Sequence, residues 1–296
     1  MTAAHQEDGT VTWRALWLET AERLGAMPGE ARWLCQAASG WEGLEWVEAL
    51  DAPATQRAVA RLDAMVARRL RGEPLQYVLG SWPFRGVDLL IDRRVLIPRP
   101  ETEQVVEVAL ELLAGRERPL VVADLGTGSG AIALALAAEL PITGVEVWAT
   151  DASPAALEVA RANLAGLGRR GANVRVAEGD WFEALPPELR GRLDLVISNP
   201  PYVADDEELP PEVEAWEPAT ALRGGPDGLR DLHRIVTDSV AWLAPRGWLV
   251  VEIGATQGAA VAGIAHRAGL EDVDVRPDLA GLDRMVIARR PGRRPA

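Results

Sequence analysis

The spacing of apolar residues indicates that the first part of the chain is helical. Residues 11–71 contain no strand-like run. In VTWRALWLETAERLG, Val11, Ala15, Leu16 and Leu18 recur at helical spacing, and Gly25 predicts the end of that helix. We therefore expect a small helical domain at this end of the chain.

A longer segment, PATQRAVARLDAMVARRLRG, carries an apolar stripe opposite a row of arginines and ends at Gly72. The stripe comprises Val59, Leu62, Met65, Val66 and Leu70. This part also holds five of the eleven tryptophans, namely Trp13, Trp17, Trp33, Trp41 and Trp46. Core filling is the favoured role for them, although aromatic residues also anchor interfaces. A short hairpin is predicted next, with VDLLID and RVLI as its strands on either side of Arg93.

From Glu101 onward, the pattern changes to alternating strands and helices. Helices are predicted over ETEQVVEVALELLAG, GAIALALAAEL, PAALEVARANLAGLG, GLRDLHRIVTDSVAWLAPRG and QGAAVAGIAHRAG. Strands are predicted over PLVVADLG, GVEVWATD, VRVAEGD, LDLVISNPP, WLVVEIG, DVDVRPD and RMVIARR. This alternation predicts an α/β fold with a mainly parallel, doubly wound sheet. Ligands of such sheets bind at the carboxyl ends of the strands, so we expect the chemistry there.

The composition is that of a globular protein, and it narrows the classes of function. The 296-residue chain is 48% hydrophobic and 25% charged, with a net charge of -13. Such an acidic chain is a poor non-specific ligand for nucleic acid or anionic lipid. The chain has one cysteine, Cys35, so an intrachain disulfide is excluded. The three histidines lie far apart in the sequence, which disfavours a metal site; they are His5, His233 and His266. MTAAHQEDGT lacks a signal pattern and no apolar stretch could span a bilayer, so we expect a cytoplasmic protein.

Three glycines follow the first strand of the alternating part, in VVADLGTGSGAIAL. Gly126, Gly128 and Gly130 allow a tight turn and let a ligand approach the backbone closely. Gly126-x-Gly128-x-x-Ala131 also fits the dinucleotide-binding fingerprint, with Asp151 about twenty residues further on. The turn alone is therefore compatible with NAD, with another nucleoside cofactor, or with no ligand.

Two further strand ends carry side chains that suit a nucleoside. Asp151 closes VWATD, where its carboxylate can accept hydrogen bonds from both ribose hydroxyls; Ser153 is better placed to cap the next helix. Asp180 and Trp181 close EGDWF. Asp180 can bind an adenine amino group, and Trp181 can stack on adenine or simply fill the core. These residues predict a nucleoside cofactor and leave NAD and S-adenosylmethionine both open.

The fourth strand end, LDLVISNPPY, predicts a pocket for a planar NH2 group. Pro200 and Pro201 fix φ and donate no backbone hydrogen bond, so they end the strand in a rigid corner. The Pro200 carbonyl and the Asn199 side-chain oxygen are then two fixed acceptors, and Tyr202 can cover the plane of the group. Hydrogen bonds to both NH2 hydrogens direct the nitrogen lone pair toward a sulfonium methyl group. An NAD-dependent oxidoreductase gives this corner no role.

DLGTGSG and NPPY together resemble the class I S-adenosylmethionine-dependent amino-group methyltransferases. Further stretches are similar to the peptide chain release factor glutamine methyltransferases, the PrmC/HemK family: GEPLQYVLGSWPF, VLIPRPETE, ATDASPAALEVARANL, GDWFEAL, EVEAWEPATALRGGPDGLRDLHRIV and VVEIGATQG. The likeness continues to the C-terminus, with Ala255 where the family often has an aromatic residue. It implies methylation of the N5 amide of the glutamine in the GGQ motif of release factors.

By position, the resemblance assigns roles to the motif residues. The methionine part of S-adenosyl-L-methionine would lie on Gly126, Thr127, Gly128, Ser129 and Gly130. Its ribose would bind Asp151, and Asp180 and Trp181 would hold its adenine. The residues that hold the glutamine would be Asn199, Pro200, Pro201 and Tyr202, of which Asn199 also contacts the cofactor; the catalytic set is Asn199, Pro200 and Tyr202. IPRPETE would wall the active site, unless Thr102 only caps the following helix.

The family also implies an architecture and partners. Residues 1–78 would be a helical substrate-recognition domain, residues 79–100 a hairpin linker, and residues 101–296 a seven-stranded Rossmann-like methyltransferase domain. We expect a monomer that acts on release factors without direct contact to nucleic acid or membrane. One alternative is a glutamine methyltransferase that acts on a ribosomal protein, and the IPRPETE stretch disfavours it. The other is a nucleic-acid adenine-N6 methyltransferase, and the acidic net charge disfavours it. The basic tail ARRPGRRPA is expected to be a frayed, solvated end.

Overall fold

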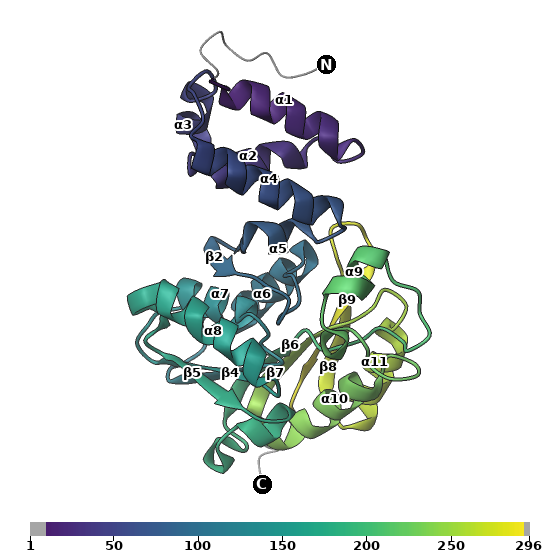
Figure 1. Cartoon of the computed structure of the whole chain (residues 1–296). Helices are drawn as coiled ribbons and strands as arrows, with labels where there is room; N and C mark the ends of the chain where they lie inside the picture. Colours follow the sequence, from purple (N-terminus) through teal and green to yellow (C-terminus); the bar gives the residue numbers. More distant parts are fainter. Residues whose placement is uncertain (1–9, 293–296) are drawn as a thin grey trace. The chain divides into compact units, whose positions relative to one another are not determined.

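The computed structural model describes residues 10–292 and divides into two compact units, Met1–Gly80 and Ser81–Ala296 (Figure 1). Residues 1–9, with His5 and most of the segment inspected for a signal sequence, lie outside the described residues, as do residues 293–296 of the basic tail. In the part between them, no helix has the length and apolar character that crossing a membrane requires. The separate roles expected for residues 1–78, 79–100 and 101–296 stay predictions.

The first unit is helical, as predicted. Its helices are α1 (Trp13–Leu24), α2 (Glu30–Ser39), α3 (Gly43–Glu48), α4 (Gln56–Leu70) and α5 (Leu75–Leu79). α1 begins after Thr12, whose Oγ1 accepts the Ala15 N–H at 3.3 Å, and it ends at Gly25. The predicted apolar face of α1 was wrong at Leu18, which is 65% exposed. The buried face is instead formed by Trp13, Leu16, Thr20 and Leu24.

Tryptophans fill much of the core of this unit. Trp13 meets Trp41 and Trp46 edge to face, with ring centroids 6.3 and 6.0 Å apart, and Trp17 meets Trp46 at 6.3 Å. Trp13 and Trp46 are almost completely buried, which confirms core filling for these two residues. Trp33, in contrast, is 48% exposed.

The apolar stripe of α4 is shorter than predicted. Its buried members are Leu62, Met65 and Val66. Leu70 is 52% exposed, and Arg69 is buried instead. The Arg69 Nε lies 2.5 Å from Glu30 Oε2 on α2, so the buried guanidinium is paired with a carboxylate.

A hairpin opens the second unit, but its strands are not those predicted around Arg93. β1 (Ser81–Phe84) pairs with β2 (Val87–Leu90), and the turn between them is Arg85-Gly86. Both turn residues have positive φ, 44° and 73°, which is the two-residue geometry that fits the twist of a hairpin. Arg93 lies beyond β2, in a turn closed by the hydrogen bond from the Val95 N–H to the Asp92 carbonyl.

The second unit is built on a seven-stranded sheet with the order β5-β4-β3-β6-β7-β9-β8. The strands are β3 (Leu120–Leu125), β4 (Val145–Asp151), β5 (Val174–Glu178), β6 (Leu193–Ser198), β7 (Leu243–Glu252), β8 (Glu271–Pro277) and β9 (Asp283–Arg289). β5, β4, β3, β6 and β7 run parallel to one another. β9 runs antiparallel to β7 and β8. The predicted doubly wound, mainly parallel sheet is confirmed. β7 starts at Leu243, earlier than predicted, because Leu243 pairs with Leu193.

Helices pack against this sheet in two groups (Figure 1). The helices of this unit are α6 (Pro100–Leu113), α7 (Ala131–Glu139), α8 (Pro154–Leu167), α9 (Pro211–Trp216), α10 (Arg230–Trp242) and α11 (Gly258–Arg267), of which α9 buries none of its residues and belongs to neither group. Short 3-10 turns are η1 (Gly168–Gly171), η2 (Trp181–Ala184), η3 (Pro187–Leu189) and η4 (Ala219–Ala221). α7 contacts α6 and α8, and α10 contacts α11; both groups contact strands. The parallel strands share one direction, so their last residues lie along one edge: Leu125, Asp151, Glu178, Ser198 and Glu252.

Candidate active site

A cavity of about 560 Å³ lies at the carboxyl ends of the parallel strands. The strand-end residues that line it include Gly126, Thr127, Gly128, Ser129, Asp151, Asp180, Trp181, Asn199 and Pro201. The remaining wall comes from the segment after the hairpin and from the loop before α10, including Val95, Pro98, Thr102, Pro218 and Ala221. The fold therefore brings most of the predicted site residues together. Three of them, Gly130, Pro200 and Tyr202, are not among the lining residues.

The glycine-rich turn after β3 forms one wall of the cavity. Gly126 and Gly128 have φ of 72° and 57°, a conformation that side chains disfavour. A Cβ on Gly126 would come within 3.1 Å of the Trp181 ring, whereas a Cβ on Gly128 would lie in open space. A Cβ on Gly130 would instead meet Leu134 at 3.1 Å, so this glycine serves the packing of α7. The turn thus sets the position of Trp181 and leaves Gly128 accessible.

Asp151, at the end of β4, ties the glycine-rich turn to the next helix. Its Oδ2 accepts the Gly128 N–H at 2.9 Å, and its Oδ1 accepts the Ser153 N–H at 2.8 Å. Burial raises the pKa of Asp151 above its usual value, although these backbone hydrogen bonds oppose the change. Ser153 caps α8 by accepting the Ala156 N–H, so Asp151 is not the N-cap. Its carboxylate is free to contribute to the cavity wall.

Asp124 is a buried carboxylate that the sequence analysis missed. Its Oδ2 accepts the Thr127 hydroxyl at 2.6 Å and the Ala133 N–H at 3.1 Å. Burial raises the pKa of Asp124 to about 7. Its Oδ1 has no hydrogen-bond partner among residues 10–292. The available signal was an acidic residue inside an otherwise apolar strand, directly before the glycine-rich turn.

Asp180 and Trp181 follow β5, and both line the cavity. Trp181 has φ of 51°, an uncommon value for a side chain of its size. Asp180 Oδ2 lies 2.5 Å from the guanidinium of Arg234, which also contacts Glu183 at 3.1 Å. One oxygen of Asp180 is therefore already paired, and its predicted bond to an adenine amino group stays a prediction.

Asn199 and Pro200 carry two unengaged acceptors at the end of β6. The Asn199 Nδ2 donates a hydrogen bond to Thr102 Oγ1 at 3.2 Å. Neither the Asn199 Oδ1 nor the Pro200 carbonyl accepts a hydrogen bond from another described residue. Pro200 is buried and Pro201 lines the cavity. Both acceptors are therefore available, and that they bind an NH2 group stays a prediction.

Tyr202 does not line the cavity and is held by two hydrogen bonds. Its hydroxyl donates to Glu252 Oε1 at 3.3 Å, and its carbonyl accepts from Gln257 Nε2 at 2.9 Å. Burial raises the pKa of Tyr202 above its usual value, so the phenol stays protonated. That its ring covers a bound NH2 group stays a prediction.

IPRPETE lines the cavity through Pro98 and Thr102, and it is held by Glu217, another residue that the sequence analysis missed. Glu217 Oε2 accepts the Ile97 N–H at 3.1 Å, and its Oε1 lies 2.5 Å from Arg99 Nη2. The side chain of Glu217 is 1% exposed, so this carboxylate is fully committed to the segment. The residue that precedes α6 is Arg99, which means that the alternative role of Thr102 as N-cap was wrong. Thr102 Oγ1 donates instead to Glu252 Oε2 at 2.7 Å.

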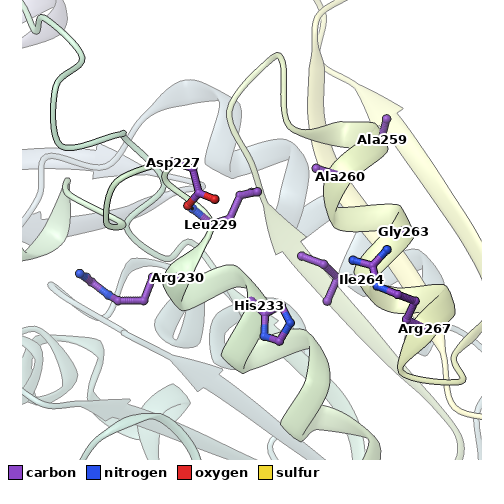
Figure 2. Close-up of a pocket in the computed structure, with 9 residues that line it drawn as sticks. All are labelled: Asp227, Leu229, Arg230, His233, Ala259, Ala260, Gly263, Ile264 and Arg267. Carbon is purple, nitrogen blue, oxygen red and sulfur yellow. The ribbon is translucent and has the colours of Figure 1, made fainter.

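A second hollow, of about 420 Å³, lies between α10 and α11 (Figure 2). Asp227, Arg230, His233 and Arg267 are its polar residues. Figure 2 shows the Arg230 side chain directed away from His233 and Arg267, so the basic groups do not converge. Arg230 bonds instead to Asp231 and to the Arg223 carbonyl. The strand-end cavity is therefore the candidate active site.

Comparison with known proteins identifies the family and the fold of the chain. Residues 105–214 match the methyltransferase small domain family, and residues 18–80 match the PrmC N-terminal domain family. The human methyltransferase 10 domain containing protein has the same fold, with a TM-score of 0.50 and 20% identity over 69% of this chain and 90% of that chain.

Two curated relatives cover most of the chain. The release factor glutamine methyltransferase of Burkholderia pseudomallei is 43% identical over 92% of this chain and 96% of its own. The enzyme of the same name from Cereibacter sphaeroides is 46% identical over 81% of this chain and 82% of its own. The chain has the strand-end cavity and the NPPY corner, and it shares this identity with relatives over most of both chains. The protein therefore belongs to the family of release factor glutamine methyltransferases.

Proposed function

We propose that this protein methylates the side-chain amide nitrogen (N5) of the glutamine in the GGQ motif of peptide chain release factors. The methyl donor is S-adenosyl-L-methionine. The observation that carries the proposal is the pair of unengaged acceptors, Asn199 Oδ1 and the Pro200 carbonyl, at a rigid Pro-Pro corner. A primary amide offers two N–H donors in one plane, which two such acceptors fit. Family membership supports a release factor as the protein that carries this amide.

The residues around the cavity fit S-adenosyl-L-methionine. A volume of about 560 Å³ lies within the usual range for pockets that bind small molecules. The Asp151 carboxylate accepts backbone N–H groups at both oxygens and, with about four lone-pair sites in all, retains acceptor capacity for a ribose hydroxyl. Gly128, with open space where a side chain would project, leaves room beside the main chain of the turn. Trp181 offers an aromatic face for adenine.

The residues of the corner prepare the amide for attack. When bound, S-adenosyl-L-methionine supplies a methyl group activated by a sulfonium. Asn199 Oδ1 and the Pro200 carbonyl accept the two N–H donors, which fixes the amide plane and directs the nitrogen lone pair. An amide nitrogen is a weak nucleophile because its lone pair is delocalised. Acceptors on both hydrogens leave more electron density on the nitrogen as positive charge develops there.

The proton that the amide nitrogen loses after methyl transfer passes to solvent, because no side chain that the structure describes near the corner is placed to act as a base. Tyr202 stays protonated because burial raises its pKa. Glu252 already accepts hydrogen bonds from Thr102 and Tyr202, and Glu217 from Ile97 and Arg99. The methylated amide nitrogen is strongly acidic, so its proton leaves readily after transfer without a strong base.

Transfer of a labelled methyl group tests this proposal. The full-length protein is incubated with S-adenosyl-L-methionine labelled in its methyl group and with a release factor, a ribosomal protein or DNA. Label is expected on the release factor alone, and a release factor whose GGQ glutamine is replaced should stay unlabelled. Asn199→Ala should lower kcat by about 100-fold, since one of the two fixed partners is lost. Label on the ribosomal protein or on DNA instead, or an Asn199→Ala variant with full kcat, would contradict the proposal.

The proposal also covers the setting of the reaction. We expect a cytoplasmic monomer whose residues 1–78 contribute to recognition of the release factor and which does not bind nucleic acid directly. The net charge of -13 supports the last point, because binding to phosphates requires positive potential. Light scattering after size-exclusion chromatography tests the monomer, and a mass twice that of the chain would contradict it.

A further inference from the structure

The amide of Asn199 works only in one orientation, which raises the question of what fixes it. An Asn side chain ends in an oxygen that accepts and an NH2 that donates, and the two have nearly the same shape. To hold a substrate NH2 group, as the proposed function requires, Asn199 must present Oδ1. A flipped amide would present two donors to a donor and could not bind it. Something must therefore hold Nδ2 away from the substrate.

A chain of hydrogen bonds leads from Asn199 into the protein. Asn199 Nδ2 donates to Thr102 Oγ1 at 3.2 Å, and Thr102 Oγ1 donates to Glu252 Oε2 at 2.7 Å. The other oxygen of Glu252 accepts the Tyr202 hydroxyl at 3.3 Å. A hydroxyl has a single hydrogen, so a Thr102 that donates to Glu252 can only accept from Asn199. The direction of each bond therefore depends on the next one.

Glu252 can act as the fixed acceptor at the end of this chain because of where it lies. It is the last residue of β7 and is 1% exposed, so water does not compete for its oxygens. The groups that act on it are Thr102, Tyr202, Arg284 and Glu101, and the Arg284 guanidinium favours its ionised form. Arg284 is in turn held by Asp278 Oδ2, with both Nε and Nη2 at 3.1 Å.

We infer that Thr102 and Glu252 are positioning residues that set the polarity of the Asn199 amide and so make the corner selective for an NH2 group. Glu252 does not line the cavity and reaches Asn199 through Thr102, while its other oxygen holds the Tyr202 hydroxyl. When Glu252 is ionised, Thr102 donates to it and accepts from Asn199 Nδ2, which leaves Oδ1 for the substrate. When Glu252 is protonated, its hydroxyl can donate to Thr102, and Thr102 can then turn its hydrogen toward Asn199. The amide is then free to flip.

The proposal predicts an acidic limb in the pH profile of methyl transfer. Burial raises the pKa of Glu252 to about 7, so the ionised form is lost as the pH falls below that value. With this pKa, kcat/KM at pH 6 should be about tenfold below its plateau. Asp124 also has a pKa raised to about 7 and could produce a similar limb. Asp124→Asn must therefore keep the limb, while Glu252→Gln must lose it.

A matched pair of variants at Thr102 tests the same step without a titratable group. Thr102→Val keeps the shape of the side chain and removes the hydroxyl, and Thr102→Ser keeps the hydroxyl. Thr102→Val should lower kcat by about tenfold, because the amide loses the partner that holds its polarity. Thr102→Ser should retain most of the wild-type kcat. Binding of S-adenosyl-L-methionine by calorimetry should be unchanged in both, which separates positioning from a structural defect.

The outcomes separate this inference from the proposed function on which it rests. If the wild-type protein does not label a release factor, the proposed function is wrong. If it does, but Thr102→Val has the kcat of the wild type or the acidic limb persists in Glu252→Gln, only the positioning role is refuted. Loss of S-adenosyl-L-methionine binding in Thr102→Val would also refute it, since the residue would then act on the cofactor site.

Discussion

Gly228 holds the backbone of the NPPY corner in place, and its replacement is the sharpest test of how that corner is supported. The loop from Gly224 to Gly228 packs directly on the main chain after Asn199. A Cβ on Gly228 would overlap the Tyr202 carbonyl oxygen and lie 2.7 Å from Gln257 Nε2, the group that donates to that carbonyl. Only a residue without a side chain therefore fits there.

The cost of Gly228→Ala follows from two separate effects. Gly228 has φ of 70°, and a side chain in this conformation costs about 1 kcal/mol. The overlap with Tyr202 and Gln257 adds about 1–3 kcal/mol, as in other overpacked sites. Gly281 provides the matched control, because it has φ of 80° and nothing within 4 Å of an added Cβ. Gly281→Ala should cost only the conformational part, about 1 kcal/mol.

The effect on activity should exceed the effect on stability. Ordinary contact distances of about 3.5 Å require the corner or the loop to move by roughly 1 Å. Such a displacement of the Pro200 carbonyl should lower kcat by about 100-fold, because the amide is no longer aligned for transfer. Urea unfolding and labelled methyl transfer to a release factor measure the two effects. The reasoning is refuted if Gly228→Ala is folded and as active as Gly281→Ala.

Three other predictions concern the carboxylates Asp151, Glu217 and Asp124. Asp151→Ala should raise the Kd for S-adenosyl-L-methionine by about 10- to 100-fold, because hydrogen bonds to a charged acceptor are lost. Calorimetry measures this Kd, and an unchanged value would contradict the prediction. Glu217→Ala leaves the Ile97 N–H and the Arg99 guanidinium without their carboxylate, so the unfolding free energy in urea should fall by about 2 kcal/mol; an unchanged midpoint would argue against this clamp. The pKa of Asp124 is raised from 3.8 to about 7, so its contribution to stability is complete below pH 3.8 and is lost as the pH rises through 7. Between pH 5 and pH 8 this loss is on the order of 3 kcal/mol, and Asp124→Asn should remove it; equal pH slopes of the two proteins would exclude it.

The local pattern of apolar and polar residues was sufficient to predict the strands and the residues at the strand ends. Apolar runs bounded by glycine and proline predicted all seven strands of the sheet, because strand length and burial follow from the period of the sequence. The parallel direction of those strands then placed Asp151, Trp181 and Asn199 at one edge, which the cavity confirms. The turn of the hairpin was missed, because Arg85-Gly86 lies between strands of only four residues.

The sequence by itself determined the α/β fold, the strand-end motifs and the acceptor corner, since these depend on neighbours in the chain. Only the tertiary structure decided which side chains support that corner. Thr102 and Glu252 lie 150 residues apart, and Glu217 lies 120 residues from Ile97, so no local period connects them. The same holds for Arg69, which is buried because Glu30 is there to pair with it. A buried polar group requires a specific partner, and the partner is chosen by the packing of distant elements rather than by sequence spacing.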